Sequence, residues 1–261
     1  MRIATWNVNS IRSRIDRVEA WLARTDVDVL LMQETKARDE QFPRDRFRAL
    51  GYEVAHHGTN QWNGVAILSR VGLDDVQVGF DGDPGWGEPL VAEARSIGAT
   101  CNGIRLWSVY VPNGRALDDP HMDYKLDWLT RLRERATEWA ADGTPVALCG
   151  DWNIAPQDGD VWSMEYYLDK SHVSPPERAA FNAFLEAGFV DVVRPHTPGP
   201  GVYTYWDYQR LAFQKRRGMR IDFVLGSATF AARVAGAAID REERKGAGAS
   251  DHAPVVVELE D

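Results

Sequence analysis

Short apolar runs recur along the whole chain, and most of them are rich in β-branched and aromatic residues. That composition favours strands over helices. The predicted strands are residues 2–6, 27–33, 64–69, 104–111, 146–149, 221–225 and 253–259. Strands that alternate with helices early in the chain and return near its end are typical of a layered α/β domain.

Helical periodicity appears between the strands. Apolar residues at spacings of three and four predict helices over residues 11–22, 122–140 and 174–188. The last of these begins at Ser174 with Glu177 three residues on, which is the pattern of a capping box. The Gly-, Pro- and Asp-rich stretch 79–89 and the irregular stretch 157–173 are predicted loops. No linker or shift in composition divides the chain, so residues 1–261 are expected to form a single domain.

Composition and charge narrow the expected cellular location and the expected binding partners of the protein. The formal charge of −9 makes nucleic-acid binding a poor first expectation, unless basic residues cluster locally or a metal ion bridges the protein to phosphate. Two cysteines are too few for a disulfide framework. No apolar signal core or membrane-length run is present. The sequence therefore predicts a cytoplasmic protein with no membrane association.

Polar residues gather at the ends of the predicted strands. They are Asn7, Glu34, Tyr110, Asn113, Asp151, Asn153, Asp222, Asp251 and His252. Taken singly, an Asp such as Asp151 is more often a turn residue, whose side chain bonds nearby backbone N–H groups. Asp222 is harder to explain in this way, because a carboxylate inside an apolar strand needs a partner. His252 is a suitable one.

Taken together, these residues indicate chemistry on a phosphate. Mg²⁺ prefers oxygen ligands and binds one or two carboxylates together with a substrate phosphate. Glu34 and Asp251 suit that role, and Asn7 and Asn153 offer neutral polar groups beside it. A histidine held by an aspartate can stabilise charge on a phosphoryl group. Neither a GxSxG motif nor a P-loop is present.

Seven segments, in order along the chain, resemble the exonuclease III family of the endonuclease/exonuclease/phosphatase superfamily. They are ATWNVNSIR (4–12), LLMQETK (30–36), GVAILSR (64–70), VYVPNG (109–114), GDWNIAP (150–156), RIDFVL (220–225) and SDHAPV (250–255). The resemblance implies a four-layer α/β/β/α sandwich, in which two facing, mostly antiparallel sheets have helices outside. The active site would lie at one edge, where strand ends from both sheets meet.

The resemblance also implies a Mg²⁺-dependent DNA-repair nuclease, with Mn²⁺ as a substitute metal, that works as a monomer on double-stranded DNA, especially abasic or 3′-blocked DNA. The implied activities are 3′→5′ exonuclease action, cleavage 5′ to abasic sites and removal of 3′ blocking groups. The implied metal site is made of Asn7, Glu34, Asp151, Asn153, Asp251 and His252. The implied catalytic residues are Tyr110, Asp151, Asn153, Asp222 and His252, with Asp151 activating water and Asp222 orienting His252.

DNA contact is expected from residues 204–222, which combine aromatic and basic side chains. By position in the family, Tyr205, Met219 and Ile221 would line a small apolar pocket with Trp206 nearby, and such pockets accept a flipped nucleotide. The basic residues Arg216, Arg217 and Arg220 would hold phosphates, and Asn113 is a weaker phosphate contact. A solvated loop and a pair of core aromatic residues remain the alternative reading of this segment.

Two other functions stay open. A phosphoesterase of the same superfamily could act on lipid or inositol phosphates, although the basic and aromatic loop is closer to the DNA branch. A binding protein could have kept the fold and lost catalysis. Against that stands the full set of expected residues, since a silent relative would be expected to lack at least one of them.

Overall fold

The computed structural model describes residues 1–260, and within them the strands form two six-stranded sheets. The first sheet has the order β11 (Val234–Ile239), β12 (Val255–Leu259), β1 (Arg2–Asn7), β2 (Val29–Gln33), β4 (Val65–Ser69) and β3 (Glu53–His57). The second has the order β5 (Asp74–Val78), β6 (Ser96–Cys101), β7 (Ile104–Tyr110), β8 (Val146–Asp151), β10 (Asp222–Gly226) and β9 (Val190–Asp191).

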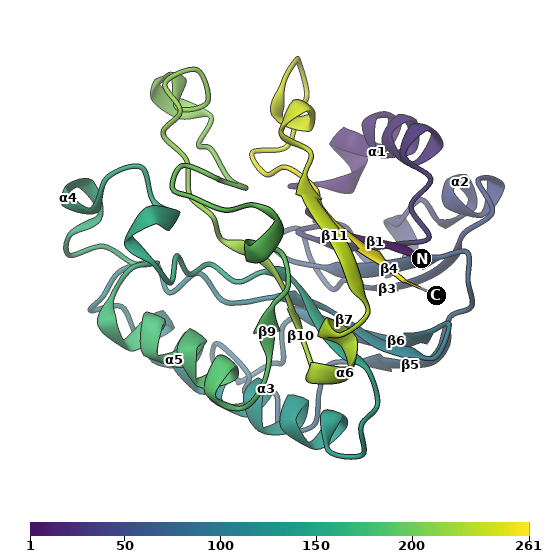
Figure 1. Ribbon diagram of the computed structural model, residues 1–261, viewed down its shortest axis with the longest axis horizontal. Helices are drawn as coiled ribbons and strands as arrows, with labels where there is room; N and C mark the ends of the chain where they lie inside the picture. The colour runs from purple at the N-terminus through teal and green to yellow at the C-terminus, as the bar shows by residue number, and fades with distance from the viewer. Residues whose placement is uncertain (261) are drawn as a thin grey trace.

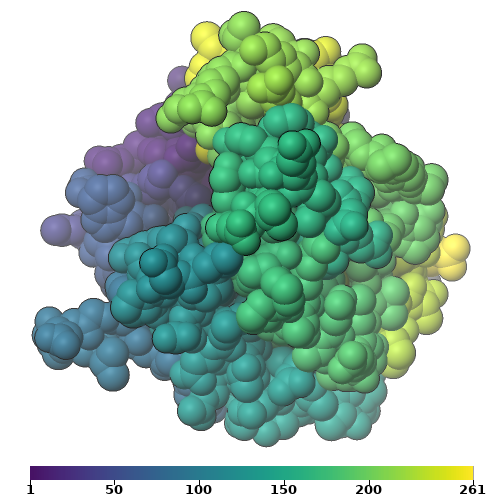
Figure 2. All heavy atoms as spheres, turned by 90° about the vertical axis from the view of Figure 1, so that its left-hand side faces the viewer, coloured from purple at the N-terminus to yellow at the C-terminus, as the bar shows by residue number. Residues whose placement is uncertain are grey.

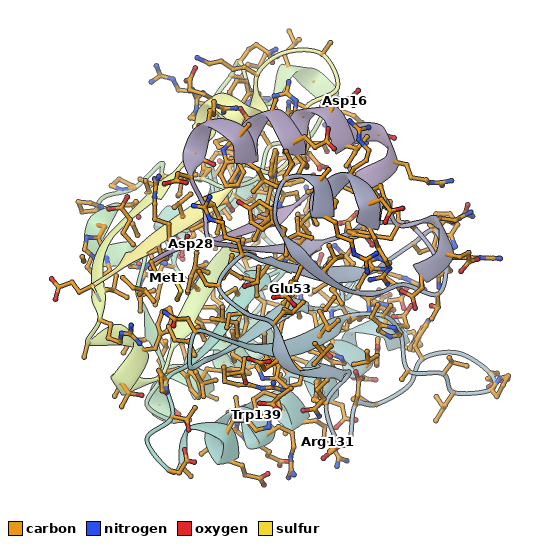
Figure 3. All side chains as sticks on the ribbon, turned by 90° about the vertical axis from the view of Figure 1, so that its right-hand side faces the viewer. Met1, Asp16, Asp28, Glu53, Arg131 and Trp139 are labelled. Atoms are coloured by element: carbon orange, nitrogen blue, oxygen red, sulfur yellow. The ribbon has the colours of Figure 1, made fainter. Side chains whose placement is uncertain are left out.

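Helices cover the outer faces of both sheets. On one side of the molecule lie α1 (Ile11–Thr25) and α2 (Arg44–Ala49), and on the other lie α3 (Pro120–Ala140) and α5 (Pro175–Glu186) (Figure 1). Figure 3 shows the same layers from another side, with Asp16 of α1 at the top and Arg131 and Trp139 of α3 at the bottom. The short helices are α4 (Met164–Tyr167) and α6 (Ala228–Ala231), and 3₁₀ turns occur at Asp39–Gln41, Asp158–Asp160, Arg194–His196, Gln209–Leu211 and Arg241–Arg244.

Three apolar layers hold the sandwich together. Alternate residues of each strand point to opposite faces, so Ile3 packs between the sheets while its neighbour Ala4 packs under α1. The same division separates Cys149, between the sheets, from Leu148, which packs against the α3 and α5 side. Because both faces of the central strands are buried, their sequences read as continuous apolar runs.

The predicted four-layer fold is confirmed. All seven predicted strands and all three predicted helices are present, with boundaries shifted by three residues or fewer. The capping box at Ser174 and Glu177 forms as expected. Five strands were missed: β3, β5, β6, β9 and β11. Four of the five, β3, β5, β9 and β11, are edge strands with partly exposed residues, and β6 carries Ser96 and Gly98, so their apolar pattern is weak. Residues 79–89 are largely irregular, whereas 157–173 contains a 3₁₀ turn and α4.

None of the helices in the described part of the chain combines the length and the apolar character needed to cross a membrane.

Candidate active site

The strand ends meet at one edge of the sandwich, as the family resemblance implied. In the second sheet Asp151 closes β8, opposite Tyr110, which closes the parallel strand β7. Asp222 opens the antiparallel strand β10 and also pairs with Asp151. In the first sheet Asn7 closes β1, and its amide reaches across to Asp151 Oδ2 at 3.0 Å. Carboxylates and amides from both sheets therefore face one another.

Gly150 makes the close strand spacing beside Asp151 possible. A Cβ atom at this position would lie 1.8 Å from the carbonyl oxygen of Val109 on β7. Any side chain here would push the two strands apart and move Asp151 away from Tyr110. The glycine in the GDWN stretch is thus explained by packing at the site.

Glu34 is held from several directions. Its Oε1 accepts hydrogen bonds from Asn7 Nδ2 at 2.9 Å and from the Tyr110 hydroxyl at 2.8 Å. The ammonium of Lys36 lies 2.9 Å from its Oε2. Its backbone has a φ of 50°, a left-handed conformation that is costly for a glutamate. Such local strain is typical of functional positions, and here it turns the side chain into the site just after β2 ends.

Asp151, His252 and Asp222 form a buried line. His252 Nδ1 lies 2.8 Å from Asp222 Oδ2, and its Nε2 lies 3.7 Å from Asp151 Oδ2. Asp151 is 1% exposed and His252 is 3% exposed. Asp222 Oδ1 has no hydrogen-bond partner among the described residues. The imidazole is therefore oriented by one carboxylate and presented to another.

Burial and neighbouring charges shift the pKa values of Asp151, His252 and Glu34. Burial, together with the nearby carboxylates of Asp222 and Glu34, raises the pKa of Asp151 to about 7, although His252 opposes the shift. Burial alone would lower the pKa of His252, but Asp222 and Asp151 raise it to about 10. Burial also disfavours ionised Glu34, yet Lys36 and Asn7 outweigh it and keep the pKa of Glu34 below its usual value. At neutral pH the site thus combines an imidazolium with carboxylates that differ in basicity.

Three of these residues could hold a metal ion. Glu34, Asp151 and His252 each present one ligand atom, and these atoms lie within 4.8 Å of one another. Two of the three donors are carboxylate oxygens, the kind that Mg²⁺ and Mn²⁺ accept. The two carboxylates therefore fit a hard divalent cation. His252, which is paired with Asp222, could join them only in its neutral form, because an imidazolium has no free lone pair.

The other predicted metal-site residues lie beside this cluster. The side chain of Asn153 accepts a hydrogen bond from Asn113 at 3.2 Å and donates one to the carbonyl of Val111 at 3.0 Å. Asp251 accepts a hydrogen bond from Asn9 Nδ2 at 3.0 Å. The side chains of Asn113, Asn153 and Asp251 line a cavity of about 160 Å³. Glu34, Tyr110, Asp151 and His252 line the same cavity.

Of the predicted DNA contacts, Tyr205, Met219 and Ile221 line that same cavity. Arg216 and Arg217 are exposed on the loop before β10.

Two other predicted DNA contacts, Arg220 and Trp206, are corrected by the structure, whereas Asn113 lines the cavity. Arg220 is 2% exposed and makes a two-pronged ion pair with Asp191, at 2.7 and 2.9 Å. Trp206 is also buried and packs edge-on against Phe213, with ring centroids 5.2 Å apart. Side chains alternate along an extended segment, so Arg220 points inward while its neighbours Met219 and Ile221 face the cavity.

Three site residues escaped sequence reasoning. Lys36 contacts Glu34, His172 Nδ1 donates to the Asn153 carbonyl at 2.6 Å, and Lys125 Nζ donates to the same carbonyl at 2.7 Å. Lys125 did leave a signal, because a lysine three residues after Met122 and four before Leu129 falls on the apolar face of its helix. His172 lies in an irregular stretch with no periodicity, so no pattern pointed to it.

The fold and the site define a class of protein. Residues 4–252 match the Endonuclease/Exonuclease/phosphatase family, and the chain belongs to it. Within the family the predicted exonuclease III branch is confirmed, and the chain is a phosphodiester-hydrolysing nuclease of that type. This is a family of metal-dependent nucleases, in keeping with the cluster of Glu34, Asp151 and His252.

Relatives of known sequence or structure match along nearly their whole length. An exodeoxyribonuclease from Bacillus subtilis is 31% identical over 98% of this chain and 98% of its own. The structure of a 3′ phosphatase, NExo, from Neisseria, bound to a product DNA hairpin, matches with a TM-score of 0.94 and 36% identity, over 100% of this chain and 99% of that one. An AP endonuclease from Archaeoglobus fulgidus matches with a TM-score of 0.93 and 36% identity, over 100% of both chains.

Proposed function

We propose that this protein is a Mg²⁺-dependent DNA-repair phosphodiesterase, with Mn²⁺ as a substitute metal. Its proposed activities are 3′→5′ exonuclease action on double-stranded DNA, cleavage 5′ to abasic sites and removal of 3′ phosphate or other blocking groups. The observation that carries the proposal is the meeting of Glu34, Asp151 and His252 at one strand edge, with ligand atoms within 4.8 Å of one another. The relatives named above include an exodeoxyribonuclease, a 3′ phosphatase and an AP endonuclease.

One reaction accounts for all three activities. In each, a water oxygen bonds to phosphorus while the bond between phosphorus and O3′ breaks, and the departing O3′ takes up a proton. The product strand keeps a 3′ hydroxyl whether the released group is a nucleotide, an abasic fragment with its downstream strand, or inorganic phosphate. A single site can therefore serve all three, and the substrates differ only in what lies on the 3′ side.

Asp151 is proposed to take the proton from the attacking water. A general base works best when its pKa lies near the operating pH, and the pKa of Asp151 is raised to about 7. Asn7 and the backbone N–H of Asn153 each donate a hydrogen bond to this carboxylate, at 3.0 and 2.9 Å. They hold it at the end of β8, where it can orient water for in-line attack.

His252 and Tyr110 are proposed to stabilise charge on the phosphate. His252 carries a proton at neutral pH because its pKa is raised to about 10, and Asp222 fixes its ring. Preorganised donors of this kind stabilise developing negative charge most strongly when water is excluded. Asn153 and Asp251 line the same cavity, and Asn7 donates hydrogen bonds to Glu34 and Asp151. Bound Mg²⁺, held by Glu34 with these groups and Asp151 and His252 beside it, would offset further negative charge on the phosphoryl oxygens.

DNA is proposed to enter over the loop that precedes β10. Arg216 and Arg217 supply local positive charge on this loop, which can attract phosphates although the whole chain has a formal net charge of −9. Tyr205, Met219 and Ile221 supply apolar walls of the catalytic cavity itself, where an abasic sugar would lie. We also propose that the chain acts as one domain and as a monomer, and that it works in the cytoplasm.

The test uses one duplex in three forms: blunt, with a 3′ phosphate, and with a single abasic-site analogue. Each is incubated with Mg²⁺, with Mn²⁺ or with EDTA. Release of mononucleotides, release of phosphate and a nick 5′ to the abasic site are expected with either metal and are absent with EDTA. Hydrolysis of inositol phosphates without cleavage of any duplex would overturn the proposal, and so would DNA cleavage that persists in EDTA.

A further inference from the structure

A buried line of three polar side chains lies behind Glu34, outside the cluster described above. The hydroxyl of Thr35 lies 2.9 Å from His56 Nε2, and His56 Nδ1 lies 2.7 Å from Asp39 Oδ1. Thr35 is 0% exposed and His56 is 6% exposed. The order of hydroxyl, imidazole and carboxylate is that of a hydrolase triad, but a fully buried hydroxyl cannot reach a substrate. Any effect of the line on function must therefore pass through the residues that it holds in place.

The line approaches Glu34 from the helix-covered face of the first sheet. Thr35 follows Glu34 just after β2, His56 belongs to β3, and Asp39 lies in the 3₁₀ turn before α2. Figure 2 shows α1 and the segment around α2 at the left of the face in view, in purple and blue. Among the described residues that line the catalytic cavity, none belongs to this line. The three side chains therefore support the site from behind.

The hydrogen bonds of the line have one direction. A carboxylate only accepts hydrogen bonds, so His56 Nδ1 donates to Asp39. Burial lowers the pKa of His56 to about 4, although Asp39 opposes the shift, so the ring is neutral at pH 7 and its Nε2 is an acceptor. The Thr35 hydroxyl therefore donates to Nε2. The backbone N–H of Gly58 also donates to Asp39 Oδ1, at 3.0 Å, which anchors the far end of the line.

Close packing leaves these side chains no room to turn. A Cβ atom at Gly64 would lie 2.2 Å from Thr35 Oγ1, and a Cβ atom at Gly58 would lie 2.6 Å from His56 Cε1. Glycine at both positions lets the backbone approach the line this closely. Phe42 stacks on the imidazole, with ring centroids 4.1 Å apart and an interplanar angle of 23°. The hydroxyl and the imidazole are therefore fixed relative to the backbone around them.

Thr35 stands between two strained residues. Glu34 and Lys36 both have left-handed backbones, with φ of 50° and 49°. Such conformations persist only where the surroundings hold them. The Thr35 N–H donates to the Gly64 carbonyl at 3.1 Å, and the Lys36 N–H donates to the Asn63 carbonyl at 2.9 Å. The Thr35 hydroxyl adds a side-chain anchor in the middle of the turn, so its loss would let the turn relax and the Glu34 carboxylate move.

We propose that Thr35, His56 and Asp39 are positioning residues that hold the Glu34 carboxylate where it can bind a divalent metal ion. This role rests on the proposed function, because it requires the cluster around Glu34 to take a metal. Glu34 Oε1 receives two hydrogen bonds from within the site, and these fix the carboxylate only while its backbone stays in place. Groups that orient a metal ligand typically contribute about tenfold to a hundredfold in metal affinity. Loss of the line should therefore weaken metal binding without removing a ligand.

The experiment measures the Mn²⁺ affinity of the full chain without DNA, by isothermal titration calorimetry. Thr35→Val keeps the branched shape and removes the hydroxyl, and its dissociation constant for Mn²⁺ is expected to rise about tenfold. Thr35→Ser keeps the hydroxyl and is expected to keep most of the affinity. The matched control Thr130→Val makes the same change on exposed α3 and is expected to bind Mn²⁺ as the unaltered protein does.

A second readout uses the Mg²⁺ dependence of DNA cleavage. In Thr35→Val the Mg²⁺ concentration that gives half the maximal rate is expected to rise by the same factor, while the rate at saturating Mg²⁺ is largely kept. Unchanged metal affinity in folded Thr35→Val would overturn the proposal. Equal losses in Thr35→Val and Thr35→Ser would overturn it as well, since the effect would then come from packing, and so would a lack of Mn²⁺ binding by the unaltered protein.

A half-exposed position keeps the test decisive if Thr35→Val does not fold. Asp39 is such a position, and in Asp39→Asn the amide can donate to or accept from His56 Nδ1, so the ring is no longer held in one tautomer. Asp39→Asn is expected to bind Mn²⁺ more weakly than its control Asp45→Asn on exposed α2, and equal affinities would refute the role of the line. If the unaltered protein binds Mn²⁺ but cleaves no DNA, the proposed function fails while this comparison still decides the role of the line.

Discussion

The catalytic edge lies beside a second hollow of about 440 Å³, and the two are built in different ways. This hollow, here called the basic-aromatic cleft, is lined by Arg115, Trp162, Tyr166, Lys170, Arg210 and Arg217, among others. The catalytic edge consists of side chains at strand ends, such as Asp151 and His252, that are almost wholly buried. Each is fixed by bonds to groups from other strands or loops. The cleft consists of side chains on loops and on the four-residue helix α4, such as Tyr166 and Arg217, that reach into solvent.

This difference separates chemistry from recognition. Groups that transfer protons or stabilise charge must be positioned within a fraction of an ångström, and burial among strands both fixes them and shifts their pKa values. Groups that only attract or contact a bound substrate can lie on loops, where side chains adjust. Substitutions at the catalytic edge are therefore expected to affect turnover strongly, and substitutions in the cleft to affect substrate choice modestly.

The largest expected effect is that of Asp151→Asn. The amide cannot accept a proton from water, so kcat on duplex DNA with Mg²⁺ is expected to fall by about a thousandfold or more. A general base alone contributes about a hundredfold to ten-thousandfold, and the loss of charge at the metal cluster adds to that effect. DNA affinity, measured by fluorescence anisotropy, is expected to stay within about threefold, because binding depends mainly on phosphate contacts elsewhere.

The matched control for this variant is Asp127→Asn, which makes the same chemical change on exposed α3. It is expected to leave both kcat and affinity as in the unaltered protein. Normal turnover by Asp151→Asn would show that another group activates the water.

The second prediction contrasts two neighbouring arginines on either side of the boundary between the regions. Arg220→Met removes one partner of a buried, two-pronged ion pair with Asp191. Breaking such a pair costs about 3 kcal/mol of the free energy of unfolding, measurable by urea denaturation. Arg217→Met, in the exposed cleft, is expected to change the free energy of unfolding by less than about 0.5 kcal/mol and to weaken DNA binding instead.

The opposite pattern would contradict this assignment. If Arg220→Met kept full stability and lost DNA affinity, the original expectation that Arg220 contacts phosphate would be restored.

The same contrast explains which features could be predicted from the sequence. Central strands such as β1, β2 and β8 are buried on both faces, so they appear as unbroken apolar runs, and the polar residue that ends each run stands out. Asp222 was conspicuous because a carboxylate in an apolar strand requires a partner, and the structure supplies His252 at 2.8 Å. Most residues of the catalytic edge could therefore be identified from the sequence alone.

The residues of the cleft were harder to identify from the sequence, and the reasons are physical. Three of its aromatic residues, Trp162, Tyr166 and Tyr167, lie in the stretch 157–173, where no periodicity distinguishes a binding surface from an ordinary loop. The alternation that turns Arg220 inward and Met219 toward the cavity depends on the register of that segment against Tyr205, which pairs with Met219 as an isolated bridge. Such long-range register cannot be read from one sequence. Basic residues in a run were all taken as surface residues, and Arg220 was the exception.

The third prediction concerns the junction between α3 and the loops of the catalytic edge. Lys125 is fully buried, pairs with Glu177 at 2.5 Å and donates to the backbone carbonyls of Asn113 and Asn153, at 3.2 and 2.7 Å. It therefore ties together two loops that carry cavity residues. In Lys125→Met/Glu177→Gln no buried charge is left unpaired, but both carbonyls lose this donor.

We expect kcat of this double variant to fall about tenfold while KM changes by less than about threefold, because a positioning residue acts on the transition state and barely on binding. The control is Arg135→Met/Glu138→Gln, which removes an ion pair on the exposed part of the same helix. Equal kcat for the two double variants would mean that Lys125 contributes only to stability.

The smallest expected effect is a pH dependence of stability in the metal-free protein. Burial alone would lower the pKa of His252, but Asp222 and Asp151 raise it to about 10 from an ordinary 6.5. The folded state therefore binds this proton more tightly than the unfolded state, so the stabilisation is complete below about pH 6.5 and is lost as the pH rises toward 10. Between pH 7.5 and 9, above the pKa of about 7 of Asp151, the free energy of unfolding in EDTA should fall by up to about 1 kcal/mol per pH unit.

Asp222→Asn removes the main source of the shift and should flatten this slope, whereas His196→Gln, on an exposed turn, should not. A slope that is already flat in the unaltered protein would show that His252 is neutral in the folded state and would remove its proposed role as a charged partner of the phosphate.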